Sequence, residues 1–523
     1  MARKSRGRPW IVIDSETDPF VHGRMPEPFL WVAYDGSNSQ VWWDDHEGFL
    51  NWLSTFEGIA YAHNGGKFDF HFLADWMSGS LVLINDRIAS VRIGSCELRD
   101  SWCLCPTSLS SYQKNAIDYS WFEVGARQLH KQDIIRYCKS DCEYLWEILA
   151  SFHGLHPGLP LTLPGAGIKA LARIERISIP DGSEGFDDIF RPYYFGGRCE
   201  AIKPGVTDGP LYWYDINSAY PFGMTKEHWW GLSFEITDEL PEGKNYFARI
   251  SAISKGSLPY RQKGRLAYPR DTEARDYFAS HWEIQAALDT GCLDILRVHE
   301  VYIPSETRNF SNFVNHYWSL KERAEAAQDE ALRYVAKIVL NGTYGKLAQD
   351  PRKHVDWEFL APDVDPCTYE FLLNVGGRWV GGKPTPTPRF YNVATAASIT
   401  GFVRSYLWRS LCEVSEPVYC DTDCIISRSH PSNTGRHLGA WKAEGVVNQI
   451  HIAGRKLYSA RMSEKTAKHP EGIRNASKGC RLSAREIVDI VEKDAIITWE
   501  NPAPSLSIKH GARFVKRRIR KTA

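Results

Sequence analysis

Residues 417–426 carry the strongest chemical signal in the chain, Pro-Val-Tyr-Cys-Asp-Thr-Asp-Cys-Ile-Ile. Asp421 and Asp423 stand two residues apart between short runs of β-forming side chains, so the pattern predicts a hairpin with these acids in its turn. Two carboxylates on a rigid tip need a counter-charge, and oxygen-only ligands favour Mg²⁺ or Mn²⁺. Taken alone, an Asp-x-Asp turn is more often a solvated hairpin. The other acidic residues of the chain therefore decide between the two interpretations.

A second acidic set lies in the first third of the chain. Asp14 and Glu16 directly follow an apolar strand, where residues i and i+2 share a face. Asp69 opens a helix-like run after a Gly-Gly turn, and Tyr137 and Asp141 are spaced i and i+4 on one helical face. Four carboxylates and a tyrosine suit phosphodiester hydrolysis by two metal ions about 3.5–4 Å apart.

A third acidic position follows another apolar strand. Asp215 comes directly after residues 211–214, so it could complete a metal site with Asp421 and Asp423. Tyr220, five residues later, could pack under a nucleotide sugar and exclude a 2′-hydroxyl. A core tyrosine before a proline turn is the alternative interpretation of Tyr220.

Residues 310–348 contain no proline and reach their first glycine at Gly342, which predicts two helices with a polar turn near residues 328–330. One face of the second helix carries Lys337, Asn341, Tyr344 and Gly345. A lysine on that face could hold a triphosphate, and Tyr344 could stack near a base. Lys321 and Arg333 could add charge, although a solvated helix face explains these two equally well.

The composition is that of a soluble multidomain protein. The chain has 523 residues, 43% of them hydrophobic, which predicts about two to four domains. It contains no apolar run of about 18 residues and no signal-peptide pattern, so we expect neither a membrane span nor secretion. Its twelve cysteines form no zinc-ligand set, which favours reduced thiols in a cytoplasm.

The charge is balanced overall but uneven along the chain. A formal net charge of zero argues against a uniformly basic nucleic-acid binder. Basic residues nevertheless crowd both ends, with Arg3, Lys4, Arg6 and Arg8 at one and seven lysines and arginines after residue 508 at the other. Such ends suit a phosphate backbone, although a solvated tail is the alternative.

Taken together, the motifs resemble those of family B DNA polymerases. Tyr-Cys-Asp-Thr-Asp-Cys, Asp-Ile-Asn-Ser-Ala-Tyr-Pro and Lys-x3-Asn-Gly-Thr-Tyr-Gly are similar to motifs C, A and B of that family, and the first acidic set is similar to its proofreading 3′→5′ exonuclease motifs. Tyr194-Phe195-Gly196-Gly197 and Lys456-Leu457-Tyr458 resemble motifs of the protein-primed branch. Within that branch the chain looks closest to the polymerases of tectiviruses, the tailless phages with an internal membrane.

The resemblance implies an α/β multidomain fold, with an RNase H-like exonuclease domain and a right-hand polymerase that has an antiparallel palm sheet, helical fingers and a small thumb. The domains that it implies are the exonuclease at 1–190, the linker motif and first palm segment at 191–221, a first terminal-protein-region insertion with palm at 222–309, fingers at 310–347, a second such insertion at 348–392, palm at 393–440 and thumb at 441–523.

The resemblance also implies a role for each matching residue. The polymerase metal ligands would be Asp215 and Asp421, with Asp423 beside them, and the exonuclease ligands would be Asp14, Glu16, Asp69 and Asp141, assisted by Tyr137. Each site would hold two Mg²⁺, for which Mn²⁺ can substitute. The nucleotide would contact Tyr220, Lys337, Asn341, Tyr344 and Lys321. DNA would contact Asn64, Phe68, Lys114, Tyr194, Gly196, Gly197, Thr400, Arg404, Lys456 and Tyr458.

The function implied is replication of a linear viral genome that starts on a protein. The expected partners are template and primer DNA, dNTPs and a terminal protein, in the cytoplasm of a bacterial host, with the enzyme a monomer or a heterodimer with the terminal protein and not attached to a membrane. One alternative is a DNA-primed or primer-independent family B polymerase of a plasmid or mobile element, because insertions can also serve processivity. A non-catalytic binder is disfavoured by the intact acids of both sites.

Three residues depart from the family pattern: Ala219 stands where Leu or Met is usual, and Gly342 and Cys424 stand where Ser is usual. A glycine within a helix costs about 1 kcal/mol relative to alanine. None of the three replaces an expected metal ligand, so we expect effects on fidelity and nucleotide affinity rather than loss of activity.

Overall fold

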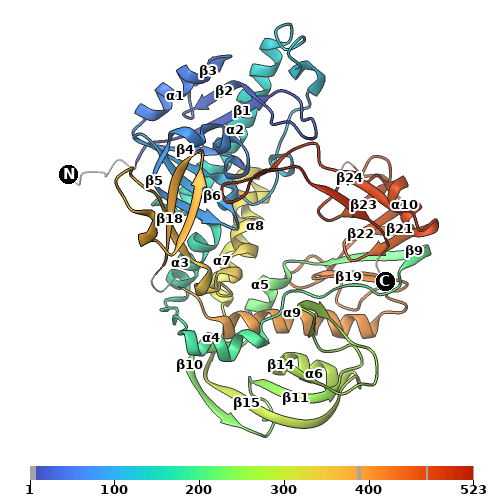
Figure 1. Ribbon diagram of the computed structural model, residues 1–523. Helices are drawn as coiled ribbons and strands as arrows, with labels where there is room; N and C mark the ends of the chain where they lie inside the picture. The colour runs from blue at the N-terminus through green and yellow to red at the C-terminus, as the bar shows by residue number, and fades with distance from the viewer. Residues whose placement is uncertain (1–7, 386–389, 467–468, 522–523) are drawn as a thin grey trace.

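The computed structural model describes residues 8–385, 390–466 and 469–521, and the chain is built around three large sheets joined by helices (Figure 1). The basic residues Arg3, Lys4 and Arg6 lie outside the described residues. No helix in the described part of the chain is both long enough and apolar enough to cross a bilayer. All twelve cysteines are free thiols, as the scattered spacing predicts.

The first sheet has ten strands and contains the N-terminal acidic residues. Its order is β17 (Phe371–Val375), β18 (Arg378–Pro384), β16 (Val355–Phe359), β5 (Met77–Ile84), β6 (Arg87–Ile93), β7 (Cys96–Asp100), β4 (Ile59–Ala62), β1 (Trp10–Thr17), β2 (Pro28–Tyr34) and β3 (Ser39–Trp43). The central strands β1, β4 and β7 run parallel. Helices α1 (His46–Thr55) and α2 (Lys131–Leu155) pack against it, so consecutive residues of β1 are buried, as expected for a sheet covered on both faces.

The first three strands of this order, β17, β18 and β16, come from the segment expected to form the second insertion. β16 pairs with β5 through Trp357 opposite Leu81, which joins the segment to the strands of the expected exonuclease domain. Gly376 and Gly377 both have positive φ and form the turn between β17 and β18. Residues 386–389, which follow this hairpin, lie outside the described residues. The backbone N–H of Asn392 donates to the carbonyl of Leu347 at 3.0 Å, so the two ends of the insertion meet.

The second sheet holds the two other acidic segments. Its seven antiparallel strands are, in order, β23 (Ile473–Ser477), β22 (Leu457–Met462), β21 (Trp441–Gly454), β9 (Gly205–Ile216), β20 (Cys424–Ser427), β19 (Tyr419–Asp421) and β8 (Cys199–Ala201). Strands β21 to β23 belong to the expected thumb but hydrogen-bond into the expected palm sheet, so the sheet runs across the boundary at residue 441. Beyond it follow α10 (Ala484–Glu492) and two small sheets, β24 (Ile497–Glu500) with β27 (Lys516–Ile519) and β25 (Ser505–Ser507) with β26 (Gly511–Arg513).

The third sheet forms the first insertion. Its order is β10 (His228–Thr237), β15 (Asp294–Arg308), β11 (Phe247–Ile253) and β14 (Arg275–Ser280), with α6 (His281–Asp289) and the hairpin β12 (Tyr260–Gln262) and β13 (Arg265–Ala267) beside it. Helix α9 (Val393–Glu413) lies between this sheet and the palm sheet (Figure 1) and is buried on almost every face. A helix apolar all round is what a position between two layers requires.

The two helices predicted over residues 310–348 are confirmed as α7 (Ser311–Ala326) and α8 (Glu330–Gly342). The side chain of Asp329 accepts a hydrogen bond from the N–H of Leu332 and caps α8. The α-helical face expected to reach Gly345 stops at Gly342, and Tyr344 lies in a 3-10 turn, η7 (Tyr344–Lys346). The buried side of α8 shares one core with α2 and with α3 (Leu163–Glu175), so the expected fingers pack against the expected exonuclease domain.

Candidate active sites

The acidic hairpin predicted at residues 417–426 is present in the structure. Asp421 ends β19 opposite Cys424, which begins β20, and Thr422 between them has a φ of 61°. The N–H of Thr422 donates to the carbonyl of Arg198 at 2.6 Å, which anchors the turn to the neighbouring strand β8. β20 also pairs with β9, where Cys424 lies opposite Asp215. The ladder therefore places Asp215 beside the tip that carries Asp421 and Asp423.

Burial and mutual repulsion shape the electrostatics of these three acids. Burial raises the pKa of Asp215, and the charge of Glu444 raises that pKa further. Burial, with the charges of Asp215 and Asp421, raises the pKa of Asp423 to about 6. The ammonium of Lys456 contacts Asp421 directly and supplies one positive charge. Converging carboxylates that resist ionisation suit a divalent cation, so this donor set fits Mg²⁺ or Mn²⁺.

Two tyrosines stack next to the acidic tip. Tyr220 belongs to the short helix α5 (Ala219–Met224), and its ring lies 4.0 Å from that of Tyr344 at an interplanar angle of 16°. Both rings are half-buried, and burial raises the pKa of each hydroxyl. Lys337 and Asn341 lie one turn apart on α8, with the Asn341 amide donating to the Lys337 carbonyl at 2.7 Å. The structure thus brings together a stacked aromatic pair and a basic helix face.

Lys321 lies on α7 rather than on α8. Its ammonium lies 4.0 Å from the centre of the Trp318 ring, and burial lowers its pKa. Its role in nucleotide binding stays a prediction.

Residues 194–197 run between the first insertion, the palm and the acidic tip. The Arg404 guanidinium donates to the carbonyls of Phe195 at 2.5 Å and Gly196 at 3.0 Å, and to the carboxylate of Glu283 at 2.8 Å. A Cβ on Gly197 would lie only 2.6 Å from the hydroxyl of Thr422. The linker therefore packs directly against the turn between the two acids.

Three of the expected DNA contacts are instead buried in the fold. Thr400 is 1% exposed and its hydroxyl donates to the Ala397 carbonyl, and Arg404 is 3% exposed. The structure departs from the expectation that these two touch the template, because the Arg404 charge is used to hold the linker. Tyr458 is 9% exposed and packs edge-on against Tyr419.

The N-terminal acids also converge. Asp14 and Glu16 lie on β1, Asp69 opens the 3-10 helix η2 (Asp69–Trp76), and Asp141 lies on α2. The hydroxyl of Ser15 donates to Asp69 and joins the strand to η2.

Cys138 also lies beside this centre, and the sequence did not predict it. Its thiol donates to Asp14 at 3.5 Å, and ligand atoms of Asp14, Glu16 and Cys138 lie within 4.8 Å of one another. The position of Cys138 next to Tyr137 on a helix is the only signal that could have found it.

Burial is also the main cause of raised pKa values in this second centre. Burial, with the charges of neighbouring acids, raises the pKa of Asp14 and of Glu16 well above the usual range, and burial raises the pKa of Asp69 to about 6. Burial also raises the pKa of Asp141, which Lys114 opposes from 3.2 Å. These carboxylates too form a donor set that a divalent cation would stabilise.

Lys114, an expected DNA contact, and Tyr137, expected to assist the exonuclease ligands, lie next to each other beside the N-terminal acids. The ammonium of Lys114 lies 5.3 Å from the centre of the Tyr137 ring. The Tyr137 hydroxyl is 3.2 Å from that of Tyr119, and burial raises its pKa.

A pocket of about 470 Å³ opens onto Asp14 and Asp69. Its walls include the expected primer-binding residues Asn64 and Phe68, and the Asn64 side chain accepts a hydrogen bond from Arg87 at 2.8 Å. The other wall was not predicted, since it comes from residues 501–506 near the other end of the chain: Asn501, Ala503, Pro504, Ser505 and Leu506. Nearby, Lys509 pairs with Asp86 at 3.1 Å.

Comparison with known proteins places this geometry in a family. The chain is 33% identical to the "DNA-directed DNA polymerase" of Enterobacteria phage PRD1, in an alignment that covers 100% of both chains. The family model described as "DNA polymerase type B, organellar and viral" matches residues 113–359. This chain is a type B DNA polymerase. A "probable DNA polymerase" of Neurospora intermedia is 24% identical over 70% of this chain and 41% of its own length. The resemblance to the protein-primed, phage-type branch is thus confirmed.

Solved structures confirm the fold of this type B polymerase. Phi29 DNA polymerase with primer-template DNA and incoming nucleotide matches it with a TM-score of 0.70 at 16% identity, over 98% of this chain and 100% of the other. The same polymerase with single-stranded DNA matches with a TM-score of 0.74 at 16% identity and the same coverage. The predicted fold class, an exonuclease unit joined to palm, fingers and thumb, is therefore confirmed.

Proposed function

We propose that this type B polymerase copies DNA at the acidic tip of its palm and removes mispaired ends at the N-terminal acidic pocket. The observation that carries the proposal is the presence of two separate, largely half-buried carboxylate centres on one chain. One lies on β9 and the 419–427 hairpin, and the other lies on β1, η2 and α2. Raised pKa values at both centres support cation binding, because a bound divalent ion offsets the repulsion.

In the polymerase centre, Asp215 and Asp421 would hold two Mg²⁺, with Asp423 beside them. The ions, when bound, lower the pKa of the attacking hydroxyl and offset charge on the phosphoryl group. The chain itself contributes orientation: the Tyr220 ring, held by its stack on Tyr344, excludes a 2′-hydroxyl, and Lys337 neutralises the departing pyrophosphate. Asn341 lines the nascent base pair.

In the exonuclease centre, Asp14, Glu16, Asp69 and Asp141 would hold the ions, and Tyr137 would orient the attacking water. Lys114 holds Asp141 in place from 3.2 Å. Asn64 and Phe68 line the pocket on the side from which a frayed single strand would enter.

Initiation on a terminal protein is the finer part of the proposal. The hydroxyl of a terminal protein would attack the α-phosphate of the first dNTP, and elongation would continue from a DNA 3′-hydroxyl in the cytoplasm of a bacterial host. Two insertions support this proposal, the β10–β15 sheet with its helix and hairpin, and the β16–β18 extension of the exonuclease sheet. The full-length likeness to the PRD1 polymerase supports it too.

The two centres can be separated by substitution. Asp421→Ala should abolish primer extension and leave degradation of single-stranded DNA intact, and Asp14→Ala combined with Glu16→Ala should do the reverse. Mg²⁺ should raise the melting temperature of the wild-type chain and raise it less in either variant, because binding to the folded state stabilises it. A folded variant that loses both activities would contradict the two-site proposal.

Priming is tested with the candidate terminal protein, a template and one labelled dNTP. Transfer of label to the protein, abolished by Asp421→Ala, is the expected result. Extension of DNA primers with no label on protein, across template sequences and with either Mg²⁺ or Mn²⁺, would favour a DNA-primed enzyme instead.

A further inference from the structure

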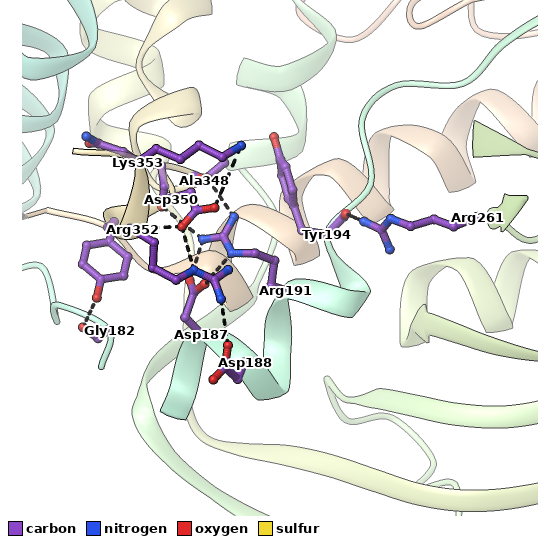
Figure 2. A network of polar contacts seen from close by, with 12 residues as sticks. Gly182, Asp187, Asp188, Arg191, Tyr194, Arg261, Ala348, Asp350, Arg352 and Lys353 are labelled. Carbon is purple, nitrogen blue, oxygen red and sulfur yellow. Dashed lines mark hydrogen bonds and ion pairs between the residues drawn. The ribbon is translucent and has the colours of Figure 1, made fainter. Parts of the chain in front are cut away.

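Arg191 lies where the exonuclease unit meets the palm. It begins the 3-10 turn η6 (Arg191–Tyr193), directly after helix α4 (Glu184–Phe190), and stands three residues before Tyr194. Its guanidinium donates to both carboxylate oxygens of Asp187, with Nη2 to Oδ1 at 2.5 Å (Figure 2). The Asp187 side chain is 2% exposed. A bidentate pair with a buried carboxylate fixes the plane of the guanidinium as well as its position.

The same guanidinium also holds the backbone at the end of the fingers. Nη2 donates to the carbonyl of Gln349 at 3.1 Å. Nη1 donates to the carbonyl of Ala348 at 3.4 Å (Figure 2). These residues follow η7 after one residue, Leu347, and the N–H of Ala348 donates in turn to the carbonyl of Gly345 at 3.3 Å. Arg191 therefore fixes the last turn of backbone behind Tyr344.

The Tyr344 side chain packs at the edge of the core shared by α2, α3 and α8. Its ring stacks on Tyr220 at 4.0 Å, so a small displacement of η7 would change the spacing of the pair. The hydrogen bond from the N–H of Leu347 to the carbonyl of Tyr344, at 3.1 Å, transmits such a displacement to the tyrosine.

A second arginine in the same cluster provides a contrast. Arg352 pairs with the carboxylates of Asp188 at 3.0 Å, Asp350 at 3.1 Å and Asp187 at 3.6 Å. Within the described chain its side-chain partners are these carboxylates, whereas Arg191 also holds backbone carbonyls. The two arginines thus share the charge cluster but differ in contact with the fingers.

We propose that Arg191 is a positioning residue for the nucleotide pocket, because it sets where Tyr344 lies against Tyr220. The inference rests on the proposed polymerase function and adds to it a residue outside every family motif quoted above. Arginine is required at this position because its planar guanidinium donates to one carboxylate and two backbone carbonyls at once. A lysine ammonium cannot make all of these contacts.

The test is steady-state incorporation of one nucleotide on a primed template by the full chain, with Arg191→Lys, Arg191→Ala and Arg352→Ala compared with the wild type. Both Arg191 variants should raise the KM for the dNTP, by about tenfold for Ala and less for Lys, with kcat changed by no more than about threefold. Arg352→Ala should leave the KM near the wild-type value. Degradation of single-stranded DNA should be unchanged in all three variants.

Each other outcome counts against the proposal. Equal increases in KM for Arg191→Ala and Arg352→Ala would show that the cluster acts only through its charge. If Arg191→Ala does not fold, Arg191→Lys decides, and a wild-type KM in that variant overturns the proposal. A wild-type chain that extends no primer overturns the polymerase function itself, and with it the role of Arg191. A wild-type chain that extends primers, beside an Arg191→Ala variant of unchanged KM, overturns only the role of Arg191.

Discussion

Gly197 occupies a position where one methyl group would disturb the polymerase centre. A Cβ there would lie 2.6 Å from Oγ1 and 2.7 Å from Cγ2 of Thr422, the residue between Asp421 and Asp423. Thr422 cannot withdraw easily, because its N–H donates to the Arg198 carbonyl and its backbone is already left-handed. The glycine of the linker motif is therefore explained by this close approach rather than by its own φ.

We expect Gly197→Ala to lower primer extension by about 10- to 100-fold, because it displaces the acids by a fraction of an ångström or more. Degradation of single-stranded DNA should be unaffected. Gly185→Ala is the matched control, since a Cβ on Gly185 would meet nothing within 4 Å. Extension by Gly197→Ala at the rate of the control would contradict the packing argument.

Gly342, one of the three departures from the family pattern, has a packing explanation. A Cβ at this position would lie 2.9 Å from Cδ2 of Leu163 on α3. The tight contact between α3 and the end of α8 leaves no room for the usual serine unless the leucine moves.

A double-mutant cycle tests this explanation. In the wild-type background, Gly342→Ala should leave the free energy of unfolding almost unchanged or lower it. The clash of the new Cβ with Leu163 offsets a helix-propensity gain of up to about 1 kcal/mol. In a Leu163→Ala background the same change should be stabilising, with a coupling of about 1 kcal/mol measured by thermal unfolding. Additive effects of the two substitutions would contradict the explanation.

At the scale of elements, the β25–β26 hairpin and the segment before it act on a site made by the opposite end of the chain. Leu506 is 3% exposed and lines the pocket beside Asp14 and Asp69. We expect Leu506→Ala to weaken single-strand degradation by about tenfold through a loosened wall, while primer extension stays within about twofold of the wild type.

Leu482→Ala controls for lost stability in the same region. Leu482 is 6% exposed and packs in the separate core around α10, away from the pocket. Equal losses of degradation in both variants would show a general effect of thumb stability and would contradict a role for the wall.

Local patterns predicted several elements and failed at long-range pairings. The 419–427 hairpin, the paired acids on β1 and the helices α7 and α8 follow from alternation, i+2 spacing and the absence of breakers, all of which act within one element. The pairing of β16 with β5 was not predictable in this way, because the residues of an edge strand do not specify which other strand it will pair with. Arg404 was misplaced for a related reason, since a charged residue looks the same in sequence whether its partner is a phosphate or Glu283.

At the scale of the whole molecule, buried histidines and buried acids oppose each other as the pH falls. Burial lowers the pKa of His228 from 6.5 to about 4, the Gly223 carbonyl partly opposing it, and His63, His71, His153 and His156 shift alike. The unfolded chain binds these protons first, so each such histidine removes stability as the pH falls from about 6.5 towards 4. The raised pKa values of the active-site acids act in the opposite sense, adding stability as these groups are protonated.

His228→Asn separates the two effects. The ring of His228 bridges the Ser398 hydroxyl at 2.9 Å and the Gly223 carbonyl at 2.6 Å, so the variant should melt at a lower temperature at neutral pH. The difference in free energy of unfolding between the wild type and the variant should narrow by about 2 kcal/mol by about pH 5. Only the wild type has a histidine at this position that binds a proton in the unfolded chain but not in the folded one. A gap that stays constant with pH would show that His228 is not held neutral.

The wall formed by residues 501–506 also orders events during synthesis of the protein. A ribosome translates Asp14, Glu16, Asp69 and Asp141 before the palm and fingers, but it translates residues 501–506, the other wall of their pocket, after them. If the proposed function holds, a nascent chain therefore contains all the acids of the exonuclease centre long before it can bind single-stranded DNA between both walls of the pocket. It acquires a finished nuclease pocket only once its palm and fingers have also been made, so the means to remove nucleotides never precedes the means to replace them.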